Sequence, residues 1–470
     1  MKKYAPYVKK YWYCFLLGPL FMVMEACGEF LLPFINADII DNGAANGDIA
    51  YILRKGGLMA CIAVFMLITG VLGAFFGIRG ASRLAAGVRK DTFRKIGKFS
   101  FANIDTFTTG SLITRITNDV TQVQNFTQSL LRGMFRSPVM IVGALIMAFR
   151  LNTTLAWILL IVVPVLAIAI AAIILISSPR YTKMQEQLDV LNTDIRETVT
   201  NERVIKSFVR EEHEKKKFAL VNEKLVEKST SALKMMLLMQ PVSTLAINIT
   251  FLCVVWVAGR KIMIGDLEIG TLTAFTTYLT QVLNALTFLA NIILQGTRAA
   301  ASDKRISEVL NASVTLNDEN ASCPEHLAAS GSVEFRGVSF LYYKHGREKV
   351  LSDVDLKIGS GELVGVIGST GSGKTTLVTM IPRLYDADSG QVLVDGVDVK
   401  DYSLANLRAA VSVVLQKNTL FSGTIADNLR WGNPDASDDE VREAAKIAQA
   451  DGFVSSFRDG YETMIGQGGA

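Results

Sequence analysis

Histidine and cysteine are scarce in this 470-residue chain, which has three of the first and five of the second. No metal-ligand spacing surrounds the histidines, and four of the cysteines fall in apolar runs without paired spacing. A zinc site or a disulfide framework is therefore not expected. Charge is also sparse, with a fifth of the residues charged and a net charge of +4. Because no basic soluble face accompanies that small excess, nucleic acid is not expected as a partner.

What the chain has in abundance is apolar sequence. Half of its residues are hydrophobic, and up to about residue 298 long apolar runs alternate with polar loops. Each run is close to the ~20 residues that a helix needs to cross the bilayer core. We predict six membrane spans, at residues 12–35, 52–78, 128–150, 154–177, 237–262 and 270–295. The expected class is a polytopic α-helical membrane protein, with the lipid bilayer as a partner.

The loops between these spans differ in charge. Residues 79–127 and 178–236 form long loops rich in Lys and Arg, whereas residues 36–50 contain neither. The positive-inside rule places the long loops and both termini in the cytoplasm, with the chain in the cell (plasma) membrane. Helical periodicity in the long loops predicts helices that continue the spans into the cytoplasm, with a short turn at residues 100–107 at one tip.

The character of the sequence changes after the last span. Residues 311–330 are small and polar and are interpreted as a linker. From Gly331 onward, short runs typical of strands predict a soluble α/β domain, including a hairpin at residues 391–399 with an Asp395-Gly396 turn. The predicted organisation is a membrane domain at 1–310, the linker, and a second domain at 331–470.

One motif in the second domain points to nucleotide chemistry. Residues 368–375, GSTGSGKT, match G-x-x-x-x-G-K-[ST] and lie between a predicted strand, Leu363–Ile367, and a predicted helix, Thr375–Leu384. Glycines let backbone N–H groups curl around phosphate oxygens, Lys374 can reach the β- and γ-phosphates, and the Thr375 hydroxyl can coordinate Mg²⁺. ATP and Mg²⁺ are the expected cofactors. The predicted nucleotide-binding residues are Gly368, Ser369, Thr370, Gly371, Ser372, Gly373, Lys374, Thr375 and Thr376.

Together these features resemble the ATP-binding cassette exporters, in the half-transporter form that fuses six spans to one nucleotide-binding domain. NIDTFTTGSLITRITNDVTQVQNF (103–126) and ETVTNERVIKSFVREEHEKKKF (197–218) look like the two intracellular loop patterns of that family. The resemblance covers essentially the whole chain, and it is closest to one chain of the bacterial heterodimeric multidrug exporters.

The resemblance implies two further nucleotide contacts. VSFLYY (338–343) looks like the loop whose aromatic stacks on adenine, which the family spacing assigns to Tyr342 ahead of Tyr343. VVLQKNTLFSGTIADNL (413–429) looks like the glutamine loop, with Gln416 near Mg²⁺ and the attacking water in a catalytic role. The alternatives are a Tyr342 that only fills core and a Gln416 that is an ordinary turn residue.

The chain also departs from the family pattern. It ends at Ala470, where IGQGGA stands at the point at which the family signature would begin. The signature, the acidic strand motif with its general-base carboxylate and the switch histidine are missing. We therefore expect the chain as given to bind ATP without its own hydrolytic half, as a fragment or the product of a truncated gene. As a full-length dimer it would be an ATPase-coupled transporter.

Two carboxylates interrupt the first predicted span. Glu25 and Glu29 are four residues apart, so they share one helix face, and they fall in the middle to outer part of the bilayer. Ionisable groups at that depth are costly and usually face water or protein. They either contact cationic substrates in a cavity, form a hydrogen-bonded pair at a helix interface, or line a wet outer vestibule.

The last predicted span carries a polar stripe. At ~100° per residue its polar residues fall within one narrow arc. The stripe predicts a water-accessible cavity wall, with interhelical hydrogen bonding as the alternative. Its members are Thr273, Thr277, Gln281, Asn284, Phe288, Asn291 and Gln295.

The function that these observations favour is ATP-dependent export of drugs, lipids or other amphipathic small molecules. Each phosphate loop would be completed by a second half-transporter, in a heterodimer by preference or else a homodimer. The alternative is a nucleotide-gated regulatory or channel-like subunit that binds ATP without hydrolysing it.

Overall fold

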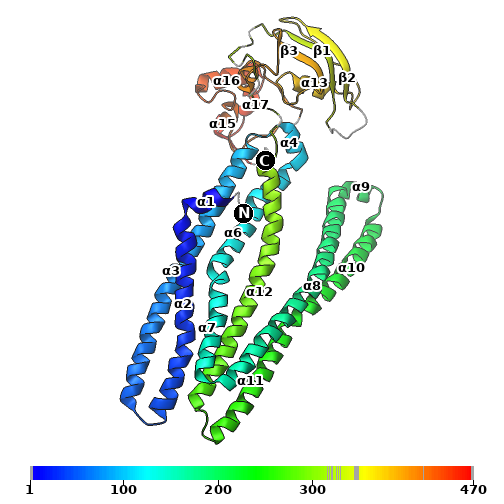
Figure 1. The fold of residues 1–470 in the computed structure, drawn as a ribbon. Coiled ribbons are helices and arrows are strands. Elements are labelled where there is room, and N and C mark those ends of the chain that lie inside the picture. The colour runs from blue at the N-terminus through cyan, green and yellow to red at the C-terminus, as the bar shows by residue number, and fades with distance from the viewer. Residues whose placement is uncertain are drawn as a thin grey trace. The chain divides into compact units, whose positions relative to one another are not determined.

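The computed structural model describes residues 4–466 apart from positions 315, 317, 319, 320, 324, 327, 329, 343–348 and 417. The described chain forms two compact units, drawn as a ribbon in Figure 1. The membrane unit comprises Met1–Lys98 and Phe107–Ser313, and the cassette unit comprises Phe99–Thr106 and Val314–Ala470. A short piece of the first long loop, residues 99–106, thus belongs with the second domain.

The membrane unit is helical throughout. In chain order its elements are α1 (Ala5–Lys10), α2 (Trp12–Asp38), the π-helical turn η2 (Ile39–Ala44), α3 (Ile49–Ile96), α5 (Thr109–Thr114), the π-helical turn η3 (Arg115–Asp119), α6 (Val120–Ser129), the π-helical turn η4 (Leu130–Met134), α7 (Arg136–Leu151), α8 (Thr153–Thr200), α9 (Glu202–Ser207), α10 (Glu211–Leu237), α11 (Met239–Met263) and α12 (Ile269–Asn311). The segments from α5 to α7 follow one another almost without a break, as the cyan ribbon of Figure 1 shows.

Six helical segments in the described residues are long and apolar enough to cross a membrane, which confirms the six predicted spans. They are Trp12–Ala44, Ile49–Ile96, Thr109–Leu151, Thr153–Thr200, Thr244–Met263 and Ile269–Asn311.

The long loops continue the spans as helices, as the periodicity predicts. α3 and α8 each have 48 residues, or about 72 Å at ~1.5 Å per residue, more than twice the thickness of the hydrocarbon core. A polar helix of this kind needs a surface to rest on. In α3 that surface is a buried face of Leu84, Ala85 and Val88, which packs against Val120 and Ile306.

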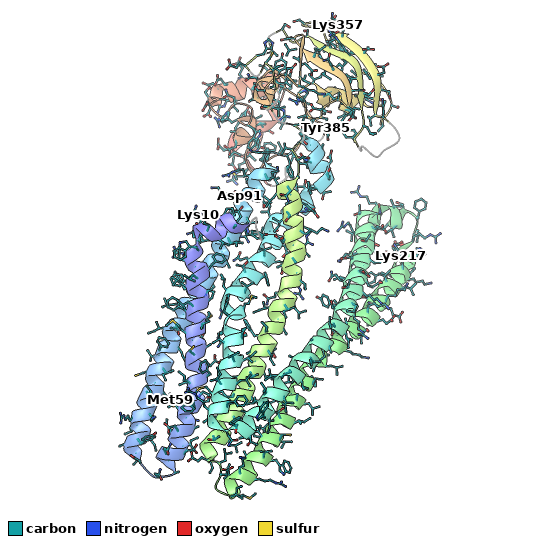
Figure 2. All side chains as sticks on the ribbon, in the orientation of Figure 1. Lys10, Met59, Asp91, Lys217, Lys357 and Tyr385 are labelled. Atoms are coloured by element: carbon teal, nitrogen blue, oxygen red, sulfur yellow. The ribbon has the colours of Figure 1, made fainter. Side chains whose placement is uncertain are left out.

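α8 and α10 run side by side as an antiparallel pair (Figure 1). Lys217 of α10, which is labelled in Figure 2, places its Nζ 2.5 Å from Oδ1 of the buried Asp194 of α8. This hydrogen bond holds the pKa of Lys217 above its ordinary value. The ammonium group therefore stays charged at neutral pH and ties the two helices together.

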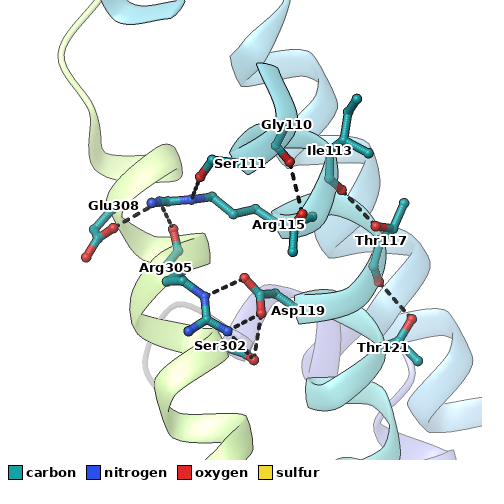
Figure 3. A network of polar contacts seen from close by, with 11 residues as sticks. Gly110, Ser111, Ile113, Arg115, Thr117, Asp119, Thr121, Ser302, Arg305 and Glu308 are labelled. Atoms are coloured by element: carbon teal, nitrogen blue, oxygen red, sulfur yellow. Dashed lines mark hydrogen bonds and ion pairs between the residues drawn. The ribbon is translucent and has the colours of Figure 1, made fainter. Parts of the chain in front are cut away.

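A second ionic contact joins η3 to α12. Asp119 is fully buried and accepts hydrogen bonds of 2.8 Å from both the Ser302 hydroxyl and Nε of Arg305. Figure 3 shows the Arg305 guanidinium turned toward this carboxylate, and Arg115 reaching from η3 to the Arg305 carbonyl and to Glu308. Because a buried carboxylate is costly without a partner, the contact fixes how these two segments pack.

The cassette unit combines one main sheet with short helices. Its elements are α4 (Phe101–Phe107), β1 (Val333–Phe340), β2 (Leu351–Ile358), α13 (Lys374–Met380), β3 (Ser389–Val394), β4 (Val397–Asp398), α14 (Leu404–Ala410), β5 (Gly423–Thr424), α15 (Ile425–Leu429), α16 (Asp438–Ile447), α17 (Asp451–Val454), the 3₁₀ turn η5 (Gly460–Glu462) and β6 (Met464–Ile465).

The main sheet is antiparallel, in the order β2-β1-β3-β4. Phe335 of β1, Met380 of α13 and the buried Tyr402 meet in its core. The predicted hairpin is confirmed, since β3 and β4 pair across Asp395 and Gly396. Both of these residues have positive φ, 50° and 76°, as a type I′ turn requires.

Two local predictions are wrong. Residues 363–367 form no strand, and Leu363 and Ile367 are fully exposed, because no strand in the described part of the cassette lies beside them to complete a ladder. The expected turn at 100–107 is instead the helix α4. Ser100 begins that helix by exchanging hydrogen bonds with Asn103, a local pattern that favours a helical start over a loop.

Candidate nucleotide and substrate sites

The glycine-rich segment lies at the start of α13. Gly371 and Gly373 have φ values of 86° and 88°, which a residue with a side chain rarely adopts. A Cβ on Gly373 would also lie 2.9 Å from Leu351 Cδ2 and 3.0 Å from the Val350 carbonyl oxygen. Glycine is therefore required at this position for the loop to lie against β2, and the exposed backbone before it is left accessible to a ligand.

Lys374 folds back over this loop. Its Nζ donates hydrogen bonds of 2.7 Å to the carbonyl oxygens of Gly368 and Ser369. These two neutral acceptors are weaker partners for an ammonium group than phosphate oxygens are. A bound nucleotide would compete for the same protons, so the lysine is placed to transfer from the loop to the phosphates. The Thr375 side chain is exposed beside it, as a Mg²⁺ ligand must be.

Tyr342 and Thr376 are brought together by the fold. The Tyr342 hydroxyl lies 2.9 Å from Thr376 Oγ1, and the Tyr342 ring makes edge contacts with Phe340 and Tyr385. Thr376 is buried and its hydroxyl is taken up by this contact, so its direct contact with a nucleotide remains a prediction. Tyr342 as a residue is 40% exposed, which is compatible with contact between its side chain and a base. The second candidate, Tyr343, lies outside the described residues.

Gln416 is exposed on a segment that is not a strand. Among the described residues its side chain makes no hydrogen bond, and nothing in the fold joins it to Lys374 or Thr375. Its assignment to Mg²⁺ and the attacking water remains a prediction.

Residues 99–106 meet the cassette at Tyr385. The Tyr385 hydroxyl donates a hydrogen bond of 2.8 Å to Asp105 of α4, and its ring packs against Phe101. Figure 2 labels this tyrosine beside α4. The same ring contacts Tyr342, so a short chain of contacts runs from α4 to α13 within the cassette unit.

In the membrane unit, the carboxylates of α2 face an arginine. Arg136 of α7 forms an ion pair and a hydrogen bond with Glu29, and its Nε lies 3.4 Å from Glu25 Oε2. Glu25 Oε2 is buried without an aligned hydrogen bond, so its attraction to Arg136 is purely electrostatic. This arrangement favours the helix-interface interpretation of the two glutamates over a free cation site.

The polar stripe of α12 divides into two parts. Gln281 donates a 3.1 Å hydrogen bond to the Glu29 carbonyl, and Gln295 accepts a 2.7 Å bond from Ser129, as interhelical contacts do. Thr273 and Thr277 bond to carbonyls of their own helix. Asn284, Phe288 and Asn291 are exposed. Phe288 and Gln295 also line cavities, and the role of the stripe as a water-accessible wall remains a prediction.

Comparison with known families decides what these sites belong to. A model described as the ABC transporter transmembrane region matches residues 15–286, and the ABC transporter model matches residues 351–464. The first match alone spans more than half of the chain. The chain belongs to the ABC transporter family.

Relatives of the transporter cover most of its length. It is 34% identical to the uncharacterized ABC transporter ATP-binding protein YfiB of Bacillus subtilis, across 100% of this chain and 81% of YfiB. YgaD of the same organism, provisionally named a multidrug export ATP-binding/permease protein, is 31% identical across 100% of this chain and 82% of its own. The ATP-dependent lipid A-core flippase of Syntrophus aciditrophicus is 30% identical, across 88% of this chain and 67% of the flippase. The resemblance to exporters is thereby confirmed.

Sequence reasoning missed several residues that the transporter places at these sites. Arg132 and Arg136 interrupt the run SLLRGMFRSPVM at the start of the third span, and that pair of charges was the available signal. Tyr385 and Asp105 carried none, because they are 280 residues apart and neither stands in a recognisable motif.

Replacing Tyr342 separates its two interpretations. If the ring stacks on adenine, Tyr342→Ala will raise the Kd of the transporter for ATP at least about fivefold, as loss of base stacking does. Tyr342→Phe keeps the ring and will bind ATP like the parent chain. Titration of a fluorescent ATP analogue measures both, and inorganic tripolyphosphate, which has no base, should bind all three proteins alike. An equal loss in the Phe variant would assign the effect to the Thr376 contact.

Proposed function

We propose that the transporter is one half of an ATP-driven exporter for amphipathic small molecules. The observation that carries this proposal is the presence, on one chain, of the phosphate loop and of six membrane helices, with α4 of the first long loop bonded to the cassette through Asp105 and Tyr385. ATP would bind with Mg²⁺, held by Lys374 and Thr375 and aided by Gln416. The cassette and both termini lie in the cytoplasm under the positive-inside rule.

A second half-transporter completes the proposed assembly. The tip that follows α8 supports this part of the proposal, because Val204, Phe208 and Val209 are 55%, 72% and 81% exposed on a polar cytoplasmic loop. Apolar side chains gathered at such a tip suit contact with another protein. We place a heterodimer first and a homodimer second. Purification of two differently tagged copies distinguishes them, since only a homodimer contains both tags.

Reconstitution tests the export function. The full gene product would be tagged in its native host, purified with any partner that accompanies it, and placed in liposomes. We expect an amphipathic fluorescent dye to accumulate inside the vesicles against its gradient when MgATP is added outside. A non-hydrolysable ATP analogue should not drive this accumulation. Downhill dye flux with the analogue would contradict the proposal and identify a nucleotide-gated channel.

A further inference from the structure

Two cavities of the membrane unit adjoin at the same pair of side chains. One has a volume of about 600 Å³ and the other about 540 Å³. Arg132 and Phe288 line both of them. The two cavities therefore share part of their walls at Arg132 and Phe288.

The larger cavity is lined mainly by apolar residues, together with the ion-paired Glu25 and Arg136 and with Arg132. Met66, Leu67 and Val71 of α3 form much of it, with Met22 of α2 beside them. These residues belong to the first two predicted spans, within the hydrocarbon core of a bilayer. The wall suits an acyl chain or another extended apolar group.

The smaller cavity is polar and positively charged. Gln122, Asn125 and Gln128 of α6 line it together with Arg132 and Arg298. The three amide residues precede Arg132 along the continuous run from α5 to α7, so this cavity extends from Arg132 toward the cytoplasmic end of the helices. No carboxylate lines it.

The charges around the two cavities do not cancel. Arg136 forms ion pairs with both Glu25 and Glu29, so these two carboxylates share one guanidinium group. Arg132 and Arg298, by contrast, form no ion pair or hydrogen bond with any residue that the structure describes. Each guanidinium carries five N–H donors in a planar fork that matches phosphate or carboxylate oxygens. Ionisable groups within membrane-spanning segments face the bundle interior or a water-filled cavity, and they mark substrate or ion pathways.

The backbone holds Arg132 in place through an unusual turn. Arg132 lies in η4, the π-helical turn Leu130–Met134, and such turns within α-helices are frequent at functional sites. A Cβ on the neighbouring Gly133 would overlap the Phe288 ring, so glycine there lets Phe288 lie against the turn. The methylene stem of Arg132 passes 3.4 Å from the position a Cβ on Gly77 of α3 would take.

The positions of Arg132 and Arg298 along their helices suit a ligand with a polar head and an apolar chain. At ~1.5 Å per residue, Arg132 is about 28 Å from Leu151, the far end of α7, which is close to the ~30 Å thickness of the hydrocarbon core. By the same measure Arg298 is about 44 Å from Ile269, which is beyond the hydrocarbon core on the cytoplasmic side. Arg132 thus lies at the cytoplasmic edge of the hydrocarbon core, Arg298 lies beyond that edge, and the apolar wall lies within the bilayer.

We propose that the substrate of this cavity is an anionic amphiphile, whose phosphate or carboxylate binds Arg132 and Arg298 and whose apolar chain packs against Met66, Leu67 and Val71. This inference rests on the proposed export function and names its substrate class. It differs from the cationic contact that is one of the sequence-based alternatives for Glu25 and Glu29, both of which form ion pairs with Arg136.

A pair of probes with the same chain and opposite charge tests the proposal. Dodecyl phosphate and dodecyltrimethylammonium would be titrated into the full gene product in nanodiscs, without nucleotide, with binding followed by intrinsic fluorescence. We expect the parent protein to bind the phosphate more tightly. Arg132→Gln with Arg298→Gln should raise the Kd for dodecyl phosphate at least about tenfold, the effect of losing hydrogen bonds to a charged group. The affinity for the cationic probe should stay unchanged.

Two control variants keep the result interpretable. Arg132→Lys retains the charge and should recover part of the affinity for the phosphate, which also shows that the site still folds. Arg260→Gln removes an arginine that stacks on Trp256 away from both cavities, and it should leave both affinities unchanged. Equal binding of the two probes by the parent protein, or equal loss of affinity in Arg260→Gln, would overturn the proposal.

The source of the anion is resolved by competition. If nanodiscs of phosphatidylglycerol weaken dodecyl phosphate binding and nanodiscs of phosphatidylcholine do not, the ligand is a membrane lipid; competition by neither identifies a soluble amphiphile. Binding in these assays needs no ATP. Charge-selective binding without ATP-driven transport would therefore refute the export function alone, and transport of a cationic dye that the double variant leaves intact would refute the anionic substrate alone.

Discussion

Lys374→Ala will weaken ATP binding by the transporter roughly ten- to a hundredfold. The lysine places its ammonium group over the loop, on the carbonyl oxygens of Gly368 and Ser369, from which bound phosphates would take it. Hydrogen bonds to charged groups contribute about 1.5–3 kcal/mol, and each 1.4 kcal/mol corresponds to a factor of ten in Kd. Titration of the full chain with a fluorescent ATP analogue gives the Kd of the parent protein and of the variant.

Lys357→Ala is the matched control for this experiment. Lys357 is an exposed lysine on β2 of the same unit, paired across the sheet with Glu334, and its removal should leave the Kd for ATP unchanged. Lys374→Arg retains the positive charge and should lose less affinity than Lys374→Ala. An unchanged Kd in Lys374→Ala would mean that nucleotide is held elsewhere, and the assignment of residues 368–376 would fail.

Arg305→Met will destabilise the membrane unit by about 3 kcal/mol, the lower end of the cost of breaking a buried ion pair. The substitution leaves the fully buried Asp119 carboxylate with the Ser302 hydroxyl in place of a guanidinium partner. The lower end applies because the Arg305 side chain is 48% exposed and is partly screened by water. The shift in the denaturation midpoint of the detergent-solubilised chain measures the effect.

Two comparisons separate the buried charge from general damage to the helices. Glu308→Gln removes the neighbouring pair with Arg115 but leaves the other hydrogen bonds of Arg115 in place, and because the Glu308 side chain is 44% exposed it should cost at most about 1 kcal/mol. Adding Asp119→Leu to Arg305→Met removes the stranded carboxylate and should restore much of the lost stability. The explanation is wrong if Arg305→Met and Glu308→Gln shift the midpoint equally.

Features that depend on neighbouring residues were predictable. The six spans follow from runs of apolar residues, because a helix in lipid satisfies its own backbone hydrogen bonds. The Asp395-Gly396 turn follows from the positive φ that both residues tolerate. The exposed phosphate loop follows from the glycine spacing, because glycine also tolerates the positive φ that Gly371 and Gly373 adopt. Each of these patterns acts over a few residues, or along one helix, so no distant partner is needed to form it.

Features that need a distant partner were not predictable. Residues 363–367 have the composition of a strand, but a strand forms only beside another one, and none in the described cassette pairs with them. Asp105 lies between two predicted membrane spans in the sequence, yet its helix α4 belongs to the cassette unit and it bonds there to Tyr385. Nothing near either residue indicates that contact, because it arises when two separate segments of the chain pack together.

The ionisable residues of the membrane helices show the same contrast between what neighbouring residues determine and what distant partners determine. The sequence by itself determined that ionisable residues lie within the spans, since hydropathy and helical spacing are enough to locate Glu25, Glu29 and the polar stripe of α12. Only the tertiary structure decided their charge balance. Arg136, 107 residues from Glu29, is brought to both glutamates by the packing of α7 on α2, while Arg132 and Arg298 are left facing a cavity. Electrostatic pairing depends on distances of a few ångströms between helices, and those distances are set by packing rather than by spacing along the chain.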